Sequence, residues 1–127
     1  MPVAFWCVLV AGLLPVLTVG IAKVGGRGYD NGDPRAWLEK QSGRSKRADN
    51  AHRNHFEAFP FFAAAVLIAT HLGAPRGTLD TLALVFIGAR LAYTACYLAD
   101  KATLRSTMWL IGYLDIIAIF LLPVFGK

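Results

Sequence analysis

The stretch Pro2–Ala22, PVAFWCVLVAGLLPVLTVGIA, contains 21 residues and no charged side chain. At about 1.5 Å per residue, a helix of this length crosses a hydrocarbon layer of about 30 Å. The stretch has no clear basic leader and no clear cleavage site, so we interpret it as a retained helix rather than a signal peptide. It therefore predicts an integral membrane protein.

Three further apolar stretches follow along the chain. Eighteen uncharged residues run from Ala58 to Pro75. Arg90 has nine uncharged residues on each side, and Asp115 follows nine and precedes eleven. The expected helices cover residues about 2–24, 50–73, 78–99 and 105–126, with a loop over residues 25–49. The prediction is an all-α chain with a single domain, residues 1–127, that forms a four-helix membrane bundle.

The composition agrees with this class and excludes others. Of the 127 residues, 56% are hydrophobic and 17% are charged, whereas soluble domains carry about a quarter charged residues. The net charge of +5 is concentrated, because seven of the thirteen basic residues lie between Lys23 and Arg47. These residues adjoin the predicted spans, so we predict no nucleic-acid partner.

The distribution of basic residues predicts the orientation in the membrane. The first loop contains most of them, and the loop before the fourth helix adds Lys101 and Arg105. The opposite side has only Arg76 and Lys127. Because cytoplasmic loops carry the excess of Lys and Arg, both basic loops are expected in the cytoplasm and both termini on the other side.

Neither the local motifs in the first loop nor the two cysteines indicate a catalytic or metal-binding site. Asp33-Pro34 is typical of a helix N-cap followed by a first-turn proline, which predicts a short helix through about Gln41. Cys7 and Cys96 lie inside apolar stretches and form no CxxC motif. We predict no metal site.

The charged residues that fall within the predicted spans include Arg53, Glu57, Arg90 and Asp115. A charge at the centre of a bilayer costs at least about 2.5–3.5 kcal/mol on insertion scales, so such residues usually face the interior of a bundle. We expect Arg90 and Asp115 to form a structural ion pair. Glu57 has a polar neighbourhood of its own, which favours a role in ligand binding.

Polar side chains recur on one side of three predicted helices. They are Asn50, Asn54, Glu57 and, at the edge, Arg53; then Arg90, Tyr93 and Tyr97; then Arg105 and Ser106. Helical periodicity allows these faces to meet in a pocket that opens to the cytoplasm. Guanidinium groups bind carboxylates through paired hydrogen bonds and a carboxylate binds ammonium, so the pocket suits a small zwitterionic or multiply charged ligand.

Three motifs together resemble the MAPEG family, membrane-associated proteins of eicosanoid and glutathione metabolism. The segment Arg47–Phe62, RADNAHRNHFEAFPFF, contains the family pattern Asn-x-x-Glu-x-x-Pro beginning at Asn54. The segment Ala89–Leu98, ARLAYTACYL, resembles the third-helix motif, and Leu104–Ser106 resembles the Arg-Ser pair that opens the fourth helix. With the four-span layout, the resemblance extends over the whole chain.

The resemblance implies a homotrimer that binds glutathione, as a co-substrate, between neighbouring subunits. The residues that it implies for glutathione binding are Asn54, Glu57, Arg53, Arg90, Tyr93, Tyr97 and, from the end of the first helix, Arg27 or alternatively Lys23. It implies catalytic roles for Arg105, beside the sulfur, and for Ser106.

The implied activity is that of a transferase or peroxidase in which the glutathione thiolate attacks a lipophilic small molecule. This electrophile is expected to reach the sulfur from the membrane lipid. Two alternatives remain. A non-enzymatic lipid-binding scaffold of the same family lacks the thiolate arginine, whereas this chain has Arg105. A small four-span exporter has an acidic residue in its first helix, and Pro2–Ala22 has none.

Overall fold

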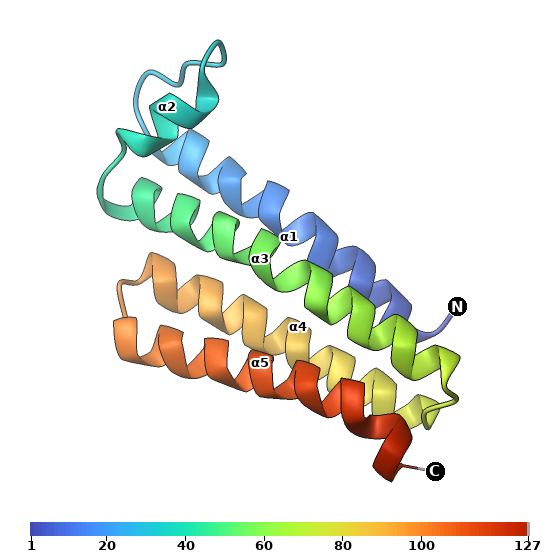
Figure 1. Ribbon diagram of the computed structural model, residues 1–127. Helices are drawn as coiled ribbons and strands as arrows, with labels where there is room; N and C mark the ends of the chain where they lie inside the picture. The colour runs from blue at the N-terminus through green and yellow to red at the C-terminus, as the bar shows by residue number, and fades with distance from the viewer. Residues whose placement is uncertain (127) are drawn as a thin grey trace.

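The computed structural model describes residues 1–126, and these residues form helices and no strand. The helices are α1 (Val3–Gly25), α2 (Pro34–Glu39), α3 (Gly43–His71), α4 (Arg76–Leu98) and α5 (Ala102–Phe125). The four long helices lie side by side, and α2 lies at one end of the bundle, beside α1 and α3 (Figure 1). The predicted all-α class is confirmed, and Lys127 lies outside the described residues.

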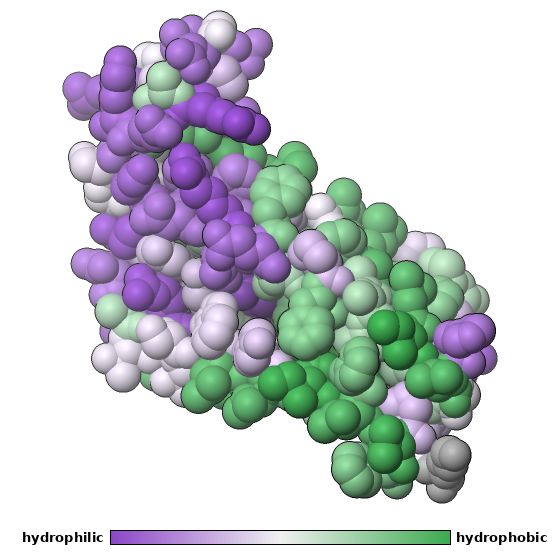
Figure 2. All heavy atoms as spheres, in the orientation of Figure 1, coloured by the Kyte–Doolittle hydropathy of each residue, from purple (hydrophilic) through white to green (hydrophobic). Residues whose placement is uncertain are grey.

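Three of the described helices, α1, α4 and α5, are long and apolar enough to cross a membrane. Helix α3 differs because its first half is rich in charged side chains and only its second half is apolar. Figure 2 shows the hydrophilic side chains gathered at the end of the bundle that carries α2, with mostly hydrophobic side chains over the rest of this face. This distribution fits a helical bundle inserted in a membrane.

The segment 25–49, predicted as a loop, contains α2 and the first residues of α3. Helix α3 begins at Gly43, about two turns before the predicted start, because this part of the helix packs on α1. There, the hydroxyl of buried Ser45 donates to the carbonyl of Ala22 at 2.7 Å. The predicted short helix is confirmed as α2, where an Asp33 side-chain oxygen accepts from the Ala36 backbone N–H at 3.3 Å.

The core of the bundle contains small side chains, branched aliphatic side chains and two stacked aromatic rings. Buried alanines of α1, α3 and α4 allow the helices to approach closely, as in other membrane bundles. Between α3 and α4, the rings of Phe62 and Phe86 stack with centroids 3.9 Å apart. This packing fixes the relative position of α3 and α4, from which most of the candidate site is built.

The two ends of the bundle are defined by polar contacts between helices. At one end, Arg47 of α3 donates to the carbonyl of Leu98 in α4 at 3.2 Å. At the other end, the backbone N–H of Ala4 donates to Asp80 of α4 at 2.9 Å. The start of α3, the end of α4 and the start of α5 therefore lie at the same end as α2 (Figure 1).

Candidate functional site

A pocket of about 140 Å³ lies between α3, α4 and α5. Its polar lining comes from Asn54, Glu57 and Arg90, three residues that the sequence places in a binding site. The remaining lining is apolar and aromatic and includes Phe61, Phe86, Trp109 and Tyr113. The pocket therefore joins a charged side to an apolar side, as small-molecule sites commonly do.

The guanidinium of Arg90 is buried beside this pocket, and the Arg90 residue is 3% exposed. Its Nη2 and Nε lie 2.8 Å and 3.2 Å from the same atom, Nδ1 of His55 on α3. Its Cζ lies 4.4 Å from the centre of the Tyr93 ring, a cation–π distance. Arg90 is thus held between a ring nitrogen and an aromatic face.

The predicted ion pair between Arg90 and Asp115 is wrong. Within residues 1–126 no ion pair joins them, and Asp115 Oδ2 is buried without a hydrogen-bond partner. The physical reason is the direction of the Arg90 side chain. Its guanidinium donates hydrogen bonds to His55 on α3, whereas Asp115 is on α5. Opposite charges at similar depths do not become partners when one of them has a closer acceptor.

Because Asp115 Oδ2 has no hydrogen-bond partner among residues 1–126, replacement of the carboxyl group should not destabilise the protein. Asp115→Asn keeps the shape of the side chain but cannot carry a negative charge. An unpaired charge within a membrane span is costly. We expect a melting temperature equal to or above that of the wild type in detergent. A clear fall in melting temperature would show that this carboxyl group has a partner that it needs.

An aromatic and cationic chain continues from Arg90 to the start of α5. The rings of Tyr93 and Tyr97 meet edge to face with centroids 5.5 Å apart. The guanidinium carbon of Arg105 then lies 4.4 Å from the centre of the Tyr97 ring. Arg105 is half-buried, and Ser106 beside it is exposed. The four predicted residues Arg90, Tyr93, Tyr97 and Arg105 therefore form one continuous series of contacts.

On α3, Asn54 and Glu57 leave hydrogen-bonding capacity unused. Their side chains meet only at 3.5 Å, between Asn54 Nδ2 and Glu57 Oε2, the outer limit of a hydrogen bond. In the part of the chain that the structure describes, Asn54 Oδ1 is buried without a partner. Buried polar atoms are normally paired, so an unpaired oxygen in a pocket lining is a candidate ligand contact.

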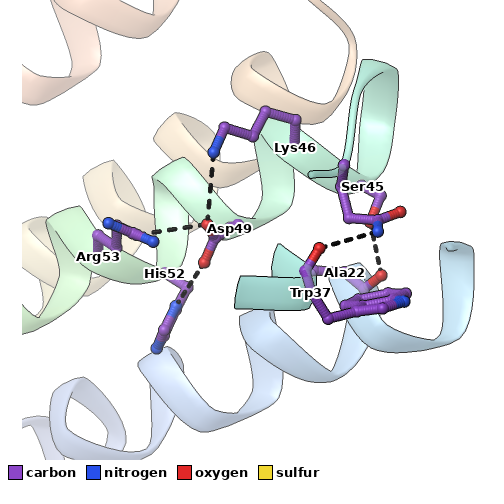
Figure 3. A network of polar contacts seen from close by, with 8 residues as sticks. Ala22, Trp37, Ser45, Lys46, Asp49, His52 and Arg53 are labelled. Atoms are coloured by element: carbon purple, nitrogen blue, oxygen red, sulfur yellow. Dashed lines mark hydrogen bonds and ion pairs between the residues drawn. The ribbon is translucent and has the colours of Figure 1, made fainter. Parts of the chain in front are cut away.

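Arg53 is placed outside this pocket. Its Nε lies 3.3 Å from Oδ2 of Asp49, a carboxylate whose side chain is 0% exposed. Asp49 also contacts His52 at 3.2 Å and Lys46 at 4.0 Å, so three basic side chains surround one acid (Figure 3). This ion cluster lies on the side of α3 that faces α2, where Arg53 lines a separate cavity.

Arg27 also lies away from the pocket, in the connection after α1, and its side chain is exposed. Its backbone carbonyl accepts from the indole N–H of Trp37 at 3.1 Å, which fixes this connection against α2. Within the single chain described here, Arg27 therefore contributes to loop structure.

Sequence reasoning missed His55, which is 2% exposed and contacts Arg90 directly. A signal was present, because His55 lies four residues after Ala51 and seven before Phe62, on the same buried face of α3. A histidine on a buried face needs hydrogen-bond partners. The pattern of charged residues did not draw attention to it, since histidine is largely neutral at pH 7.

Fold and site together define an integral membrane helical bundle with a pocket between α3, α4 and α5 that has a charged side and an apolar side. The model of the MAPEG family matches residues 3–125, and the chain belongs to that family. The resemblance to this family is thereby confirmed. No curated protein matches the chain.

Proposed function

We propose that this protein is a glutathione-dependent membrane transferase or peroxidase that acts on a lipophilic electrophile. The MAPEG family includes enzymes of both kinds. The observation that carries the proposal is the convergence of Asn54, Glu57 and Arg90 on one pocket, with a series of contacts leading from Arg90 to Arg105.

The polar groups of the pocket match those of glutathione, the proposed co-substrate. Arg90 offers guanidinium N–H groups to a carboxylate. Glu57 is exposed and free to accept from an ammonium group, and Asn54 Oδ1 accepts from a peptide N–H. Tyr93 and Tyr97 belong to the proposed binding site, where their rings hold Arg90 and Arg105 in place.

Arg105 and Ser106 are the proposed catalytic residues. A free thiol of the cysteine type has a pKa of about 8.5, and its thiolate is the nucleophile. The Arg105 guanidinium stabilises the thiolate, and the Ser106 hydroxyl donates a hydrogen bond to it. In transfer, a sulfur–carbon bond forms and the leaving group departs with its electron pair. In peroxide reduction, the thiolate attacks a peroxide oxygen, the O–O bond breaks and the other oxygen leaves, once protonated, as an alcohol. A second glutathione then condenses with the resulting sulfenic acid, which forms glutathione disulfide and releases water.

The membrane arrangement belongs to the same proposal. We place α3 as a fourth span, with its apolar half in the bilayer and its charged half at the end that carries α2. The basic connections after α1 and α4 share that end, so the positive-inside rule puts it in the cytoplasm and both termini outside. We propose a homotrimer in which Arg27 approaches the glutathione of a neighbouring subunit.

Glutathione binding tests this function. Glu57→Gln should weaken binding measured by calorimetry on the detergent-purified protein, because the change removes the negative charge that accepts from an ammonium group. The matched control is Glu39→Gln, the same change on an exposed side chain of α2. Equal affinity in the two variants would remove Glu57 from the site, and a wild type without affinity for glutathione would contradict the function.

A further inference from the structure

His55 lies on the buried face of α3 beside the pocket, and no role described above uses it. Its ring contacts two residues of α4 through its two nitrogens. Nδ1 lies 2.8 Å and 3.2 Å from Nη2 and Nε of Arg90. Nε2 lies 2.9 Å from Oγ1 of Thr94. His55 therefore joins the helix that carries Asn54 and Glu57 to the helix that carries Arg90.

The direction of each hydrogen bond follows from the donors. Guanidinium N–H groups only donate, so His55 Nδ1 accepts and carries no proton. The ring proton is then on Nε2, which donates to the Thr94 hydroxyl. That hydroxyl in turn donates to the backbone carbonyl of Arg90 at 2.9 Å. The three residues form a closed cycle in which every bond has one donor and one acceptor.

This cycle of hydrogen bonds determines which N–H groups of the Arg90 guanidinium are free to bind a ligand. Two of its N–H groups point at His55, and the Tyr93 ring covers a face of the guanidinium. The N–H groups that remain are available to the pocket that Arg90 lines. His55 is uncharged in this arrangement, so it orients Arg90 without neutralising its positive charge. A carboxylate at this position, like the one first expected from Asp115, would neutralise it.

We propose that His55 is a positioning residue of the site: its unprotonated Nδ1 orients the Arg90 guanidinium, with its charge intact, toward a carboxylate of the bound ligand. The identity of that ligand rests on the proposed function, in which it is glutathione. Because His55 acts through Arg90, its removal should change affinity and leave the chemistry at the sulfur largely intact.

Glutathione affinity provides the first test. His55→Leu should raise the Kd for glutathione by about 10-fold, as expected when a hydrogen bond to a charged group is lost. Turnover at saturating glutathione should change much less. His55→Asn should restore much of the affinity, because the amide oxygen can accept where Nδ1 does. The control is His71→Leu, the same change on an exposed histidine at the end of α3.

A double-mutant cycle separates positioning from an independent contribution. In an Arg90→Gln background, His55→Leu should lower the affinity little further, because the residue that it orients is absent. Effects that multiply in the double variant would overturn the proposal. If His55→Leu does not fold, Thr94→Val, which removes the hydroxyl that accepts from Nε2, takes its place against Thr94→Ser.

The nitrogen resonances of His55 test the geometry without any ligand. In ¹⁵N-labelled wild-type protein, Nδ1 should resonate as an unprotonated acceptor and Nε2 as a protonated nitrogen, and Arg90→Gln should shift both. A proton on Nδ1, or resonances that ignore Arg90→Gln, would overturn the proposal. A wild type that binds no glutathione would contradict the proposed function alone, since these resonances would still show whether His55 orients Arg90.

Discussion

Arg105→Leu should lower the turnover of a hydrophobic electrophile by about 100-fold, the effect of losing one donor to a developing anion. The half-buried Arg105 guanidinium packs on Tyr97 at the start of α5, next to Ser106. Without it, the glutathione thiol keeps its ordinary pKa of about 8.5, so little thiolate forms near pH 7. Glutathione binding should be largely retained, because Asn54, Glu57 and Arg90 remain. Steady-state kinetics with saturating glutathione measure the effect.

The competing explanation for Arg105 is structural, because an arginine at the end of a span often extends to lipid headgroups. The control for this explanation is Arg76→Leu, at the exposed start of α4 and at the other end of the bundle. It should leave turnover unchanged. Arg105→Lys keeps the charge and loses the planar group that packs on Tyr97, so it should retain part of the activity. Unchanged turnover in Arg105→Leu would place Arg105 with the headgroup-binding arginines.

Arg90→Gln should raise the Kd for glutathione by about 100-fold, the upper range for hydrogen bonds to a charged group. The expectation follows from the location of Arg90, whose guanidinium is buried, lines the pocket and has no carboxylate partner within residues 1–126. Under the proposed function, a carboxylate of the bound glutathione is its counterion. Calorimetry gives the affinity, and turnover at saturating glutathione should fall less than affinity does.

Arg53→Gln is the comparison that tests the geometry of the site. Arg53 lies one helical position before Asn54, but its guanidinium pairs with Asp49 on the side facing α2. Its replacement should change glutathione affinity far less than Arg90→Gln does. A loss of affinity equal to that of Arg90→Gln would contradict the division between the pocket and the ion cluster around Asp49.

Sequence predicts those parts of the fold that depend on the length of an apolar stretch or on a local cap. The uncharged stretch Pro2–Ala22 forms α1, Val3–Gly25, because a membrane leaves the backbone few alternatives to a helix. The cap at Asp33 is equally local, since one side-chain oxygen and the following proline define the start of α2. The early start of α3 was missed because it depends on packing against α1, which no local pattern encodes.

The site residues, like the elements of the fold, include some that local sequence predicts and others that depend on packing between helices. Asn54, Glu57 and Arg90 were predicted from their placement on helix faces, and the pocket brings them together. The partner of Arg90 was mispredicted because charge and depth favoured Asp115, whereas the direction of a long side chain depends on which neighbour is in reach. His55 provides that neighbour, and only the packing of α3 against α4 brings the two residues together.

Ultraviolet absorbance of the thiolate, measured as glutathione is added to the purified wild-type protein near pH 7, tests the central claim most directly. Free glutathione is mostly thiol at that pH, because its pKa is about 8.5. The proposed mechanism predicts a thiolate signal that saturates at the same glutathione concentration as the binding heat and is absent in Arg105→Leu. Saturable binding without any thiolate signal would contradict the proposed role of Arg105 and favour a scaffold.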